Sequence, residues 1–207
     1  MVASEKRQIT ILARPIFVGS IVGAIAMSVQ IFSLERIKTP TGRMVIVTTD
    51  EHWLRAVDWE DHEPRMQRLL RRHYGTNAIL CEMSCPSAAR RSLQAYFEGD
   101  LDAVTCLPTA TNGTDFQRTV WDALRRIPVG HTISYGALAF QIGRPTAMRA
   151  VGLANGANPI AIVIPCHRVI GANASLTGYG GGLDRKRWLL QHESACSAAR
   201  GESHFLT

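Results

Sequence analysis

The chain has 207 residues, 46% of them hydrophobic and 19% charged, which is typical of a globular protein and excludes a disordered one. The formal net charge of +6 lies mostly in the second half, where residues 112–207 hold ten Lys and Arg against five Asp and Glu. A basic half beside a nearly neutral one indicates a polyanionic partner, either nucleic acid or an anionic membrane, unless the charge only serves solubility.

The five cysteines are an odd number, so they cannot form a fully paired disulfide framework. Their scatter indicates a reducing compartment, and we expect the protein to act in the cytoplasm. Cys81 and Cys85 lie four residues apart, but no His or second Cys pair nearby completes a zinc site, so we expect both to be structural.

The N-terminal region carries nineteen uncharged residues from Ile16 to Leu34, preceded by three basic residues. Such a run is compatible with a signal peptide or a membrane anchor, and also with an upstream start codon placed before a true start at Met27. We expect residues 1–34 to lie outside the folded domains, as a leader or a non-native extension.

Two short β-branched or aromatic runs, residues 43–49 and 54–59, flank three polar residues and predict a β-hairpin. Apolar residues at helical spacing predict an amphipathic helix over 62–74, and a second helix begins near Pro86. We therefore expect residues 35–110 to form a small N-terminal α/β domain, an antiparallel sheet with helices. This domain contains no recognisable set of catalytic residues, and we expect it to act as a scaffold.

The second half begins with a polar stretch, residues 108–113, that predicts a linker. Thr114 and Gln117 form a capping box at the start of a helix, along which apolar residues recur with helical spacing. A last helix is predicted over residues 184–194, with Asp184 as its cap.

Two short helices between these elements predict a helix-turn-helix. Ser134 can cap the first, over 135–142, and Thr146 can cap the second, which runs to about Asn155. Many helical proteins contain such pairs without touching DNA, so the pattern alone leaves its role open.

One cysteine stands in a distinctive context. The run Ile160 to Ile164 is wholly apolar, hence buried, and it leads to Cys166. A cysteine in that position is usually inert, but His167 and Arg168 follow it, and a base or a positive charge beside a thiol favours the nucleophilic thiolate. Both an inert core residue and a nucleophile fit these features.

The sequence Pro165-Cys166-His167-Arg168-Val169-Ile170 resembles the signature of the O6-alkylguanine-DNA alkyltransferases, also called methylated-DNA–protein-cysteine methyltransferases. The resemblance extends from about Thr39 to Glu193 and is closest to the stand-alone bacterial members. Its further motifs are Phe116-Gln117, Ser134-Tyr135-Gly136, Arg149-Ala150-Val151-Gly152, Asn158-Pro159 and Tyr179-Gly180-Gly181-Gly182.

The resemblance implies an α+β fold. It places a C-terminal domain over residues 111–200, with helices and a winged helix-turn-helix-like element, after the N-terminal α/β domain, and it leaves residues 201–207 as a tail. It also implies a start at Met27, because members usually begin shortly before the segment that matches Thr39-Pro40.

The implied activity is the irreversible, single-turnover transfer of an alkyl group from O6-alkylguanine to Cys166, without a cofactor. O4-alkylthymine is a second candidate substrate. In this family the cysteine thiolate attacks the alkyl carbon in line, the histidine matching His167 acts through a bridging water, and the carboxylate matching Glu193 orients that histidine. Asn158 matches an asparagine that holds the backbone around the site. Without the resemblance, Glu193 would be read as a solvated helix residue and Asn158 as a turn residue.

The implied base pocket consists of backbone groups of Cys166, Val169 and Gly180, with Tyr179 packing beside the guanine. Tyr135 matches the tyrosine that meets the guanine and the neighbouring phosphate. Since the target carbon is inaccessible in a stacked duplex, the base must be flipped into this pocket.

The implied partner is double-stranded DNA carrying O6-alkylguanine, bound by a monomer without a stable protein partner. Arg149 matches the arginine that fills the space of the flipped base, and small residues such as Ala150 and Gly152 let the second helix enter the minor groove. Met148 departs from the family, which commonly has a small residue there. Alternatives are a non-catalytic protein of the same family that only binds alkylated bases, a cysteine hydrolase and a transcription regulator.

Overall fold

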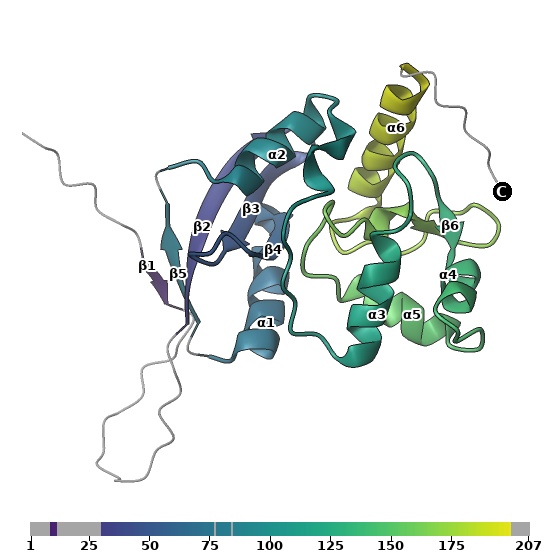
Figure 1. Cartoon of the computed structure of the whole chain (residues 1–207), viewed down its shortest axis with the longest axis horizontal. Helices are drawn as coiled ribbons and strands as arrows, with labels where there is room; N and C mark the ends of the chain where they lie inside the picture. Colours follow the sequence, from purple (N-terminus) through teal and green to yellow (C-terminus); the bar gives the residue numbers. More distant parts are fainter. Residues whose placement is uncertain (1–8, 12–29, 77, 84, 200–207) are drawn as a thin grey trace, which may run out of the picture.

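The computed structural model describes residues 9–11, 30–76, 78–83 and 85–199. A curved sheet flanked by helices forms the N-terminal half, and helices with short loops form the C-terminal half beside it (Figure 1). Among the described helices, none combines the length and the apolar character needed to cross a membrane.

The sheet has five strands in the order β1-β5-β2-β3-β4. Their bounds are β1 Ile9–Ile11, β2 Gln30–Thr39, β3 Gly42–Thr48, β4 Leu54–Trp59 and β5 Ala78–Glu82. The predicted hairpin is confirmed, because β3 and β4 pair antiparallel. The expectation of a purely antiparallel sheet is wrong: β2 and β5 run parallel, because the chain crosses over between β4 and β5 through the helix α1.

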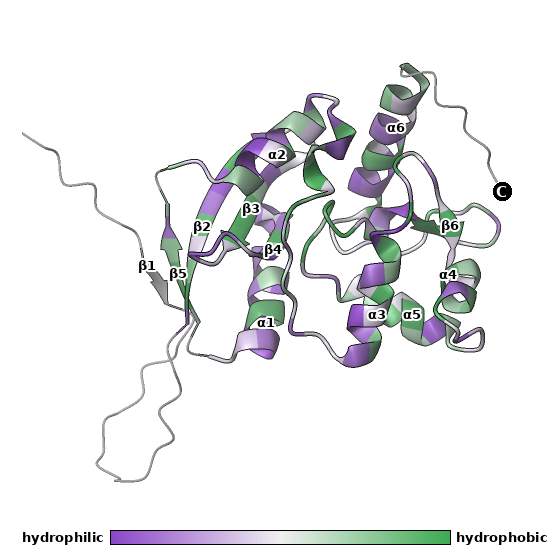
Figure 2. Ribbon diagram, in the orientation of Figure 1, coloured by the Kyte–Doolittle hydropathy of each residue, from purple (hydrophilic) through white to green (hydrophobic). Residues whose placement is uncertain are grey.

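Both faces of the sheet are covered. Helix α1 (Glu63–Tyr74) buries Met66 and Leu70 in one apolar cluster, and helix α2 (Ala88–Phe97) buries Leu93 in another. Successive residues of β3 alternate between the two clusters, as a strand with two buried faces requires. Figure 2 shows hydrophobic colour along β3, whereas α2 and α6 alternate between hydrophobic and hydrophilic bands.

The expected N-terminal extension overlaps the sheet. Strand β2 begins at Gln30, and Phe32 and Leu34 are buried in the apolar cluster under α1. Strand β1 also lies within the expected extension, and it pairs with β5. The boundary after residue 34 is therefore wrong, and residues 9–11 and 30–34 belong to the folded half. Met27 lies outside the described residues.

The C-terminal half contains most of the helices. Their bounds are α3 Asp115–Leu124, α4 Tyr135–Gln141, α5 Met148–Gly156 and α6 Leu183–Ala199. The short elements are the 3-10 helices η1 Glu60–His62, η2 Leu101–Val104 and η3 Cys166–Arg168, and the strands β6 Ile133–Ser134 and β7 Val169–Ile170, which pair in parallel.

The predicted helix starts have mixed outcomes. The capping box of Thr114 and the cap by Ser134 are confirmed. Thr146 does not cap: Ala147 precedes α5, and no side chain accepts a hydrogen bond there. Asp184 lies inside the first turn of α6, where its charge favours the helix dipole, instead of before it.

The two halves share one apolar core, which includes residues of the sheet together with residues of α3, α5 and α6. Two segments of the second half of the chain lie along the free edge of β4. Residues 108–110, expected as a linker, pair with Leu54, and residues 159–161 pair with Val57. This pairing covers the sheet edge and places the stretch that leads to Cys166 at the junction of the two halves.

The turn over residues 171–175 contains Ala174 in the left-handed region, at φ 60°. A side chain there costs energy that glycine avoids, so we expect Ala174→Gly to stabilise the fold by about 0.5–1 kcal/mol. Urea unfolding checks this value. Ala172→Gly is the matched control, because Ala172 lies in the same turn without a positive φ, and it should not be stabilising.

Candidate functional site

Cys166 begins η3 at the junction of the two halves, with 6% of its surface exposed. The amide of Asn158 donates hydrogen bonds to the carbonyl oxygen of Ile164 (2.8 Å) and to the Cys166 sulfur (3.0 Å). Its oxygen accepts from the Ile160 N–H at 2.9 Å. Asn158 thus joins both ends of the buried apolar run and contacts the thiol itself.

Burial dominates the ionisation of Cys166. It raises the pKa of the thiol, although the hydrogen bond from Asn158 and the charges of Arg65 and Lys186 act in the opposite direction. Positive charge thus favours the thiolate, as expected, but it comes from Arg65 and Lys186 instead of the adjacent residues, and it does not offset burial. The thiol is therefore protonated at neutral pH, and a nucleophilic role would require a base that removes its proton.

Glu193, on α6, is completely buried and accepts hydrogen bonds at both oxygens. Its partners are His167 Nε2 at 2.8 Å, Arg168 Nε and Nη2 at 2.9 Å each, the Tyr96 hydroxyl at 2.8 Å and the Gly130 N–H at 3.2 Å. Burial alone would favour the neutral acid, but His167 and Arg168 hold the pKa of Glu193 well below its ordinary value. The site therefore contains a buried carboxylate.

His167 is fully buried and faces this carboxylate. Burial lowers the pKa of His167 more than Glu193 raises it, so the imidazole is neutral. Its proton must sit on Nε2, since that atom donates to a carboxylate. Nδ1 is buried and has no hydrogen-bond partner among the described residues, so it can accept a proton.

The N-terminal half contributes directly to this site, which corrects the expectation that it is only a scaffold. Tyr96 reaches Glu193 from α2. Arg65, from α1, pairs with Asp58 at 2.5 Å and donates to the carbonyls of Gly156 (2.8 Å) and Asn158 (3.1 Å). No local signal marks these residues, because Tyr96 has the spacing of a core aromatic and Arg65 that of a surface helix residue.

The expected base-binding loop lies against the N-terminal half. The Tyr179 ring packs edge-on against Trp59 (5.9 Å between centroids) and His167 (6.4 Å). A Cβ atom on Gly180 would lie 2.6 Å from the Arg65 guanidinium, so a side chain there would displace that guanidinium.

Lys186 supports the start of this loop. Its ammonium group donates to the carbonyls of Val169 (2.6 Å) and Thr177 (2.8 Å), and burial lowers the pKa of Lys186 to about 8. The Val169 N–H donates to the Cys166 carbonyl. The N–H of Val169 is thus engaged within the protein, whereas its carbonyl oxygen keeps one lone pair for a ligand.

Three of the expected DNA-contact residues lie on α5, and the fourth, Tyr135, begins α4. Arg149 and Ala150 are exposed, and Gly152 faces the ring of Tyr135, which lies 3.9 Å from where its Cβ would be. Met148 is 52% exposed and Leu153 is 78% exposed on the same helix. The exposure of these two large apolar side chains is not revealed by the sequence pattern.

Known proteins are similar to this chain in sequence and in fold. Residues 115–195 match the family model of the 6-O-methylguanine DNA methyltransferase DNA-binding domain. A methylated-DNA–protein-cysteine methyltransferase of Salmonella typhimurium is 52% identical over 160 residues, which cover 77% of this chain and 94% of the relative.

Solved structures of methyltransferases are similar to this chain as well. The O6-methylguanine methyltransferase of Mycobacterium tuberculosis aligns with a TM-score of 0.65 at 43% identity, over 79% of this chain and 93% of that protein. A structure of the Mycobacterium tuberculosis OGT in complex with DNA gives the same TM-score at 42% identity, over 80% of this chain and 94% of that protein. The similarity thus spans both halves of the described structure, and the chain belongs to the family of methylated-DNA–protein-cysteine methyltransferases.

Proposed function

We propose that this chain repairs alkylated DNA by moving an alkyl group irreversibly from the O6 atom of guanine to the sulfur of Cys166. The observation that carries the proposal is the buried arrangement of a thiol, a neutral imidazole with a free Nδ1 and an ionised carboxylate, in a chain of this family. The smaller base O4-alkylthymine presents the same alkyl–oxygen bond and is included as a second substrate.

The chemistry requires a thiolate that the resting protein lacks. Cys166 gives its proton to Nδ1 of His167 through a bridging water, and Glu193 stabilises the imidazolium that forms. The sulfur then bonds to the alkyl carbon while the electron pair of the carbon–oxygen bond goes to guanine O6. The guanine anion takes up a proton from water at N1, which restores the base, and His167 returns its extra proton to water. A thioether has no good leaving group, so each molecule reacts once.

The DNA part of the proposal uses the face of α5. Arg149 is exposed, and within the described residues it forms no hydrogen bond or ion pair. We propose that it enters the base stack when the damaged base is flipped into the pocket, with α5 in the minor groove. We propose that residues 111–200 form the acceptor and DNA-binding unit, after an N-terminal unit that contains the five-stranded sheet, and that the protein acts as a monomer. Unpaired thiols at all five cysteines support action in a reducing compartment, the cytoplasm.

The direct test is incubation with duplexes that carry labelled O6-methylguanine or O4-methylthymine. We expect the label on the Cys166 peptide, at no more than one equivalent per protein molecule. Retention of the lesion without transfer would favour the alternative of a binding protein, and repeated turnover would favour a hydrolase.

Replacing the arginine of α5 separates DNA binding from chemistry. We expect Arg149→Ala to slow repair of a duplex by about tenfold or more, since flipping costs a few kcal/mol and the arginine offsets part of that cost. The reaction with the free base O6-benzylguanine should not change. Single-turnover rates on both substrates check this, and equal losses on both would place Arg149 in the pocket instead.

A further inference from the structure

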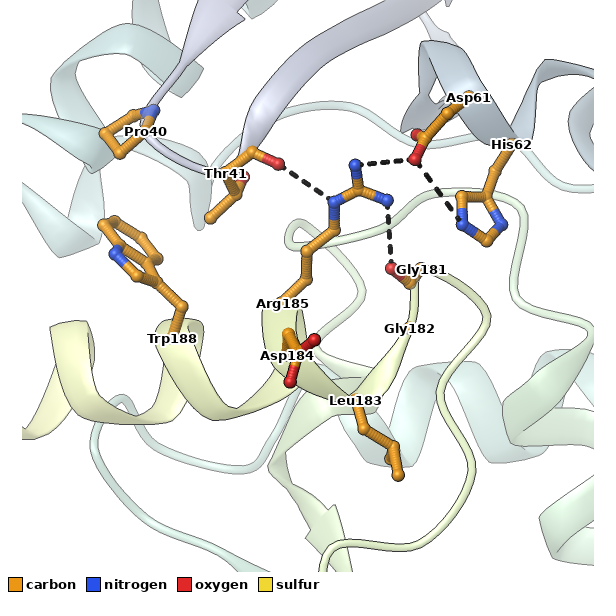
Figure 3. A pocket seen from close by; sticks show the side chains of 10 residues that line it. All are labelled: Pro40, Thr41, Asp61, His62, Gly181, Gly182, Leu183, Asp184, Arg185 and Trp188. Atoms are coloured by element: carbon orange, nitrogen blue, oxygen red, sulfur yellow. Dashed lines mark hydrogen bonds and ion pairs between the residues drawn. The ribbon is translucent and has the colours of Figure 1, made fainter.

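The side chain of Arg185 crosses the junction between the two halves (Figure 3). From the first turn of α6 its guanidinium donates to three oxygens. These are the Thr41 carbonyl and the Asp61 carboxylate, each at 2.9 Å, and the Gly181 carbonyl at 3.1 Å. The first two belong to the N-terminal half, and the third belongs to the loop of Tyr179 and Gly180.

The indole ring of Trp59 completes this arrangement. The Arg185 guanidinium lies over the ring at 5.0 Å from its centroid, and the indole N–H donates to the Thr41 hydroxyl at 3.0 Å. A Cβ atom on Gly181 would lie 2.4 Å from the ring, so the loop backbone touches the indole directly. Trp59 also contacts the Tyr179 ring, so one aromatic residue backs both the loop and its tyrosine.

Beside Arg185 the loop borders open space instead of packed side chains. A cavity of about 490 Å³ lies there, and its walls include Pro40, Asp61, Gly182 and Trp188. Three successive glycines, residues 180–182, bring no side chains of their own to fill it. On this side the loop is therefore held by the hydrogen bond from Arg185 to the Gly181 carbonyl, and without that bond it has space to move into the cavity.

We propose that Arg185 is a positioning residue for alkyl transfer, which holds the loop of residues 179–182 against Trp59 and ties it to Thr41 and Asp61 of the N-terminal half. The inference rests on the proposed function, because that loop is the expected site of the guanine base. Arg185 acts on the pocket and not on the DNA backbone, so its loss affects a free base as much as a base in a duplex.

The experiment compares Arg185→Met with Arg187→Met. Arg187 lies on the same helix, carries the same charge and pairs only with the exposed Asp184 among the described residues, so it controls for lost charge. For Arg185→Met we expect single-turnover rates on free O6-benzylguanine and on duplex O6-methylguanine to fall together by about tenfold or more, as misplacement of a reacting group predicts. Affinity for undamaged duplex should match that of Arg187→Met.

Two milder variants keep the test decisive if Arg185→Met does not fold. Arg185→Lys retains a donor but not the planar fork, and Asp61→Asn removes one charged partner, so each should give a smaller loss of the same kind. Asp61→Asn should cost little more in an Arg185→Met background, because the two residues act through one contact.

Three results would overturn the inference while the wild-type protein transfers the alkyl group. Arg185→Met could react with the free base as fast as Arg187→Met, it could lose only the duplex reaction, or both milder variants could match the wild type. Failure of the wild type to transfer any alkyl group would instead contradict the proposed function itself.

Discussion

Cys166→Ser is expected to reduce alkyl transfer by at least about a thousandfold, to below detection, while DNA binding and the fold persist. The serine hydroxyl occupies nearly the same volume and can accept the same hydrogen bond from Asn158. It is a far weaker acid than a thiol, so the proton path through His167 cannot generate a nucleophile from it. Transfer of label from duplex O6-methylguanine measures the loss, and gel retardation with the same duplex measures binding.

The other thiols supply the controls for this prediction. Cys85 and Cys106 are exposed, and serine at either position should leave transfer unchanged. Mass spectrometry of the reacted wild type should place the alkyl mass on the Cys166 peptide alone. Label on a different cysteine, or activity retained by Cys166→Ser, would contradict the assignment of the acceptor.

Local signals in the sequence predicted local structure well. The capping box at Thr114 and the cap at Ser134 depend on residues three positions apart, and both are confirmed. The buried position of Cys166 followed from the apolar run before it. Thr146 failed because the polypeptide enters α5 one residue later, at Ala147, which a one-dimensional pattern cannot resolve.

Contacts between residues far apart in the chain could not be predicted from the sequence. Tyr96 meets Glu193 across 97 positions in the chain, and Arg65 meets the Asn158 carbonyl across 93. The beginning of β2 was missed for a related reason: a strand in the interior of a sheet reads as a continuous apolar run, like a leader. Only the pairing with β3 and β5 distinguishes the two.

Proximity in sequence also misled the electrostatic prediction. Arg168 lies two residues from Cys166, yet its guanidinium forms two hydrogen bonds with Glu193 and does not serve the thiol. The cations that act on the thiol, Arg65 and Lys186, come from other elements of the structure. The charge of Arg168 thus keeps the Glu193 carboxylate ionised inside the protein.

Because Arg168 and Glu193 form a buried ion pair, Glu193→Gln is the second substitution with a large expected effect. The amide keeps the size of the side chain but leaves the Arg168 charge buried without its partner, and breaking a buried pair in this way costs about 3–5 kcal/mol of folding free energy. The transfer rate should fall by about tenfold or more as well, because a neutral partner stabilises the His167 imidazolium less. Urea unfolding and single-turnover rates measure the two effects.

The dependence of this stability loss on pH provides a sharper check. The folded-state pKa of Glu193 lies well below that of an unfolded glutamate, which is about 4.3. The carboxylate therefore stabilises the fold at all pH values above the unfolded pKa, and this contribution disappears as the pH falls toward the folded value. The difference in unfolding free energy between wild type and Glu193→Gln should be largest near neutral pH and shrink in acid.

Tyr96→Phe, which removes one donor to Glu193 and leaves the ion pair with Arg168, should cost less and show no such pH dependence. A stability difference for Glu193→Gln that instead grows as the pH falls from neutral would show that the carboxyl group is neutral in the folded protein, and the proton path through His167 would then lack its anion.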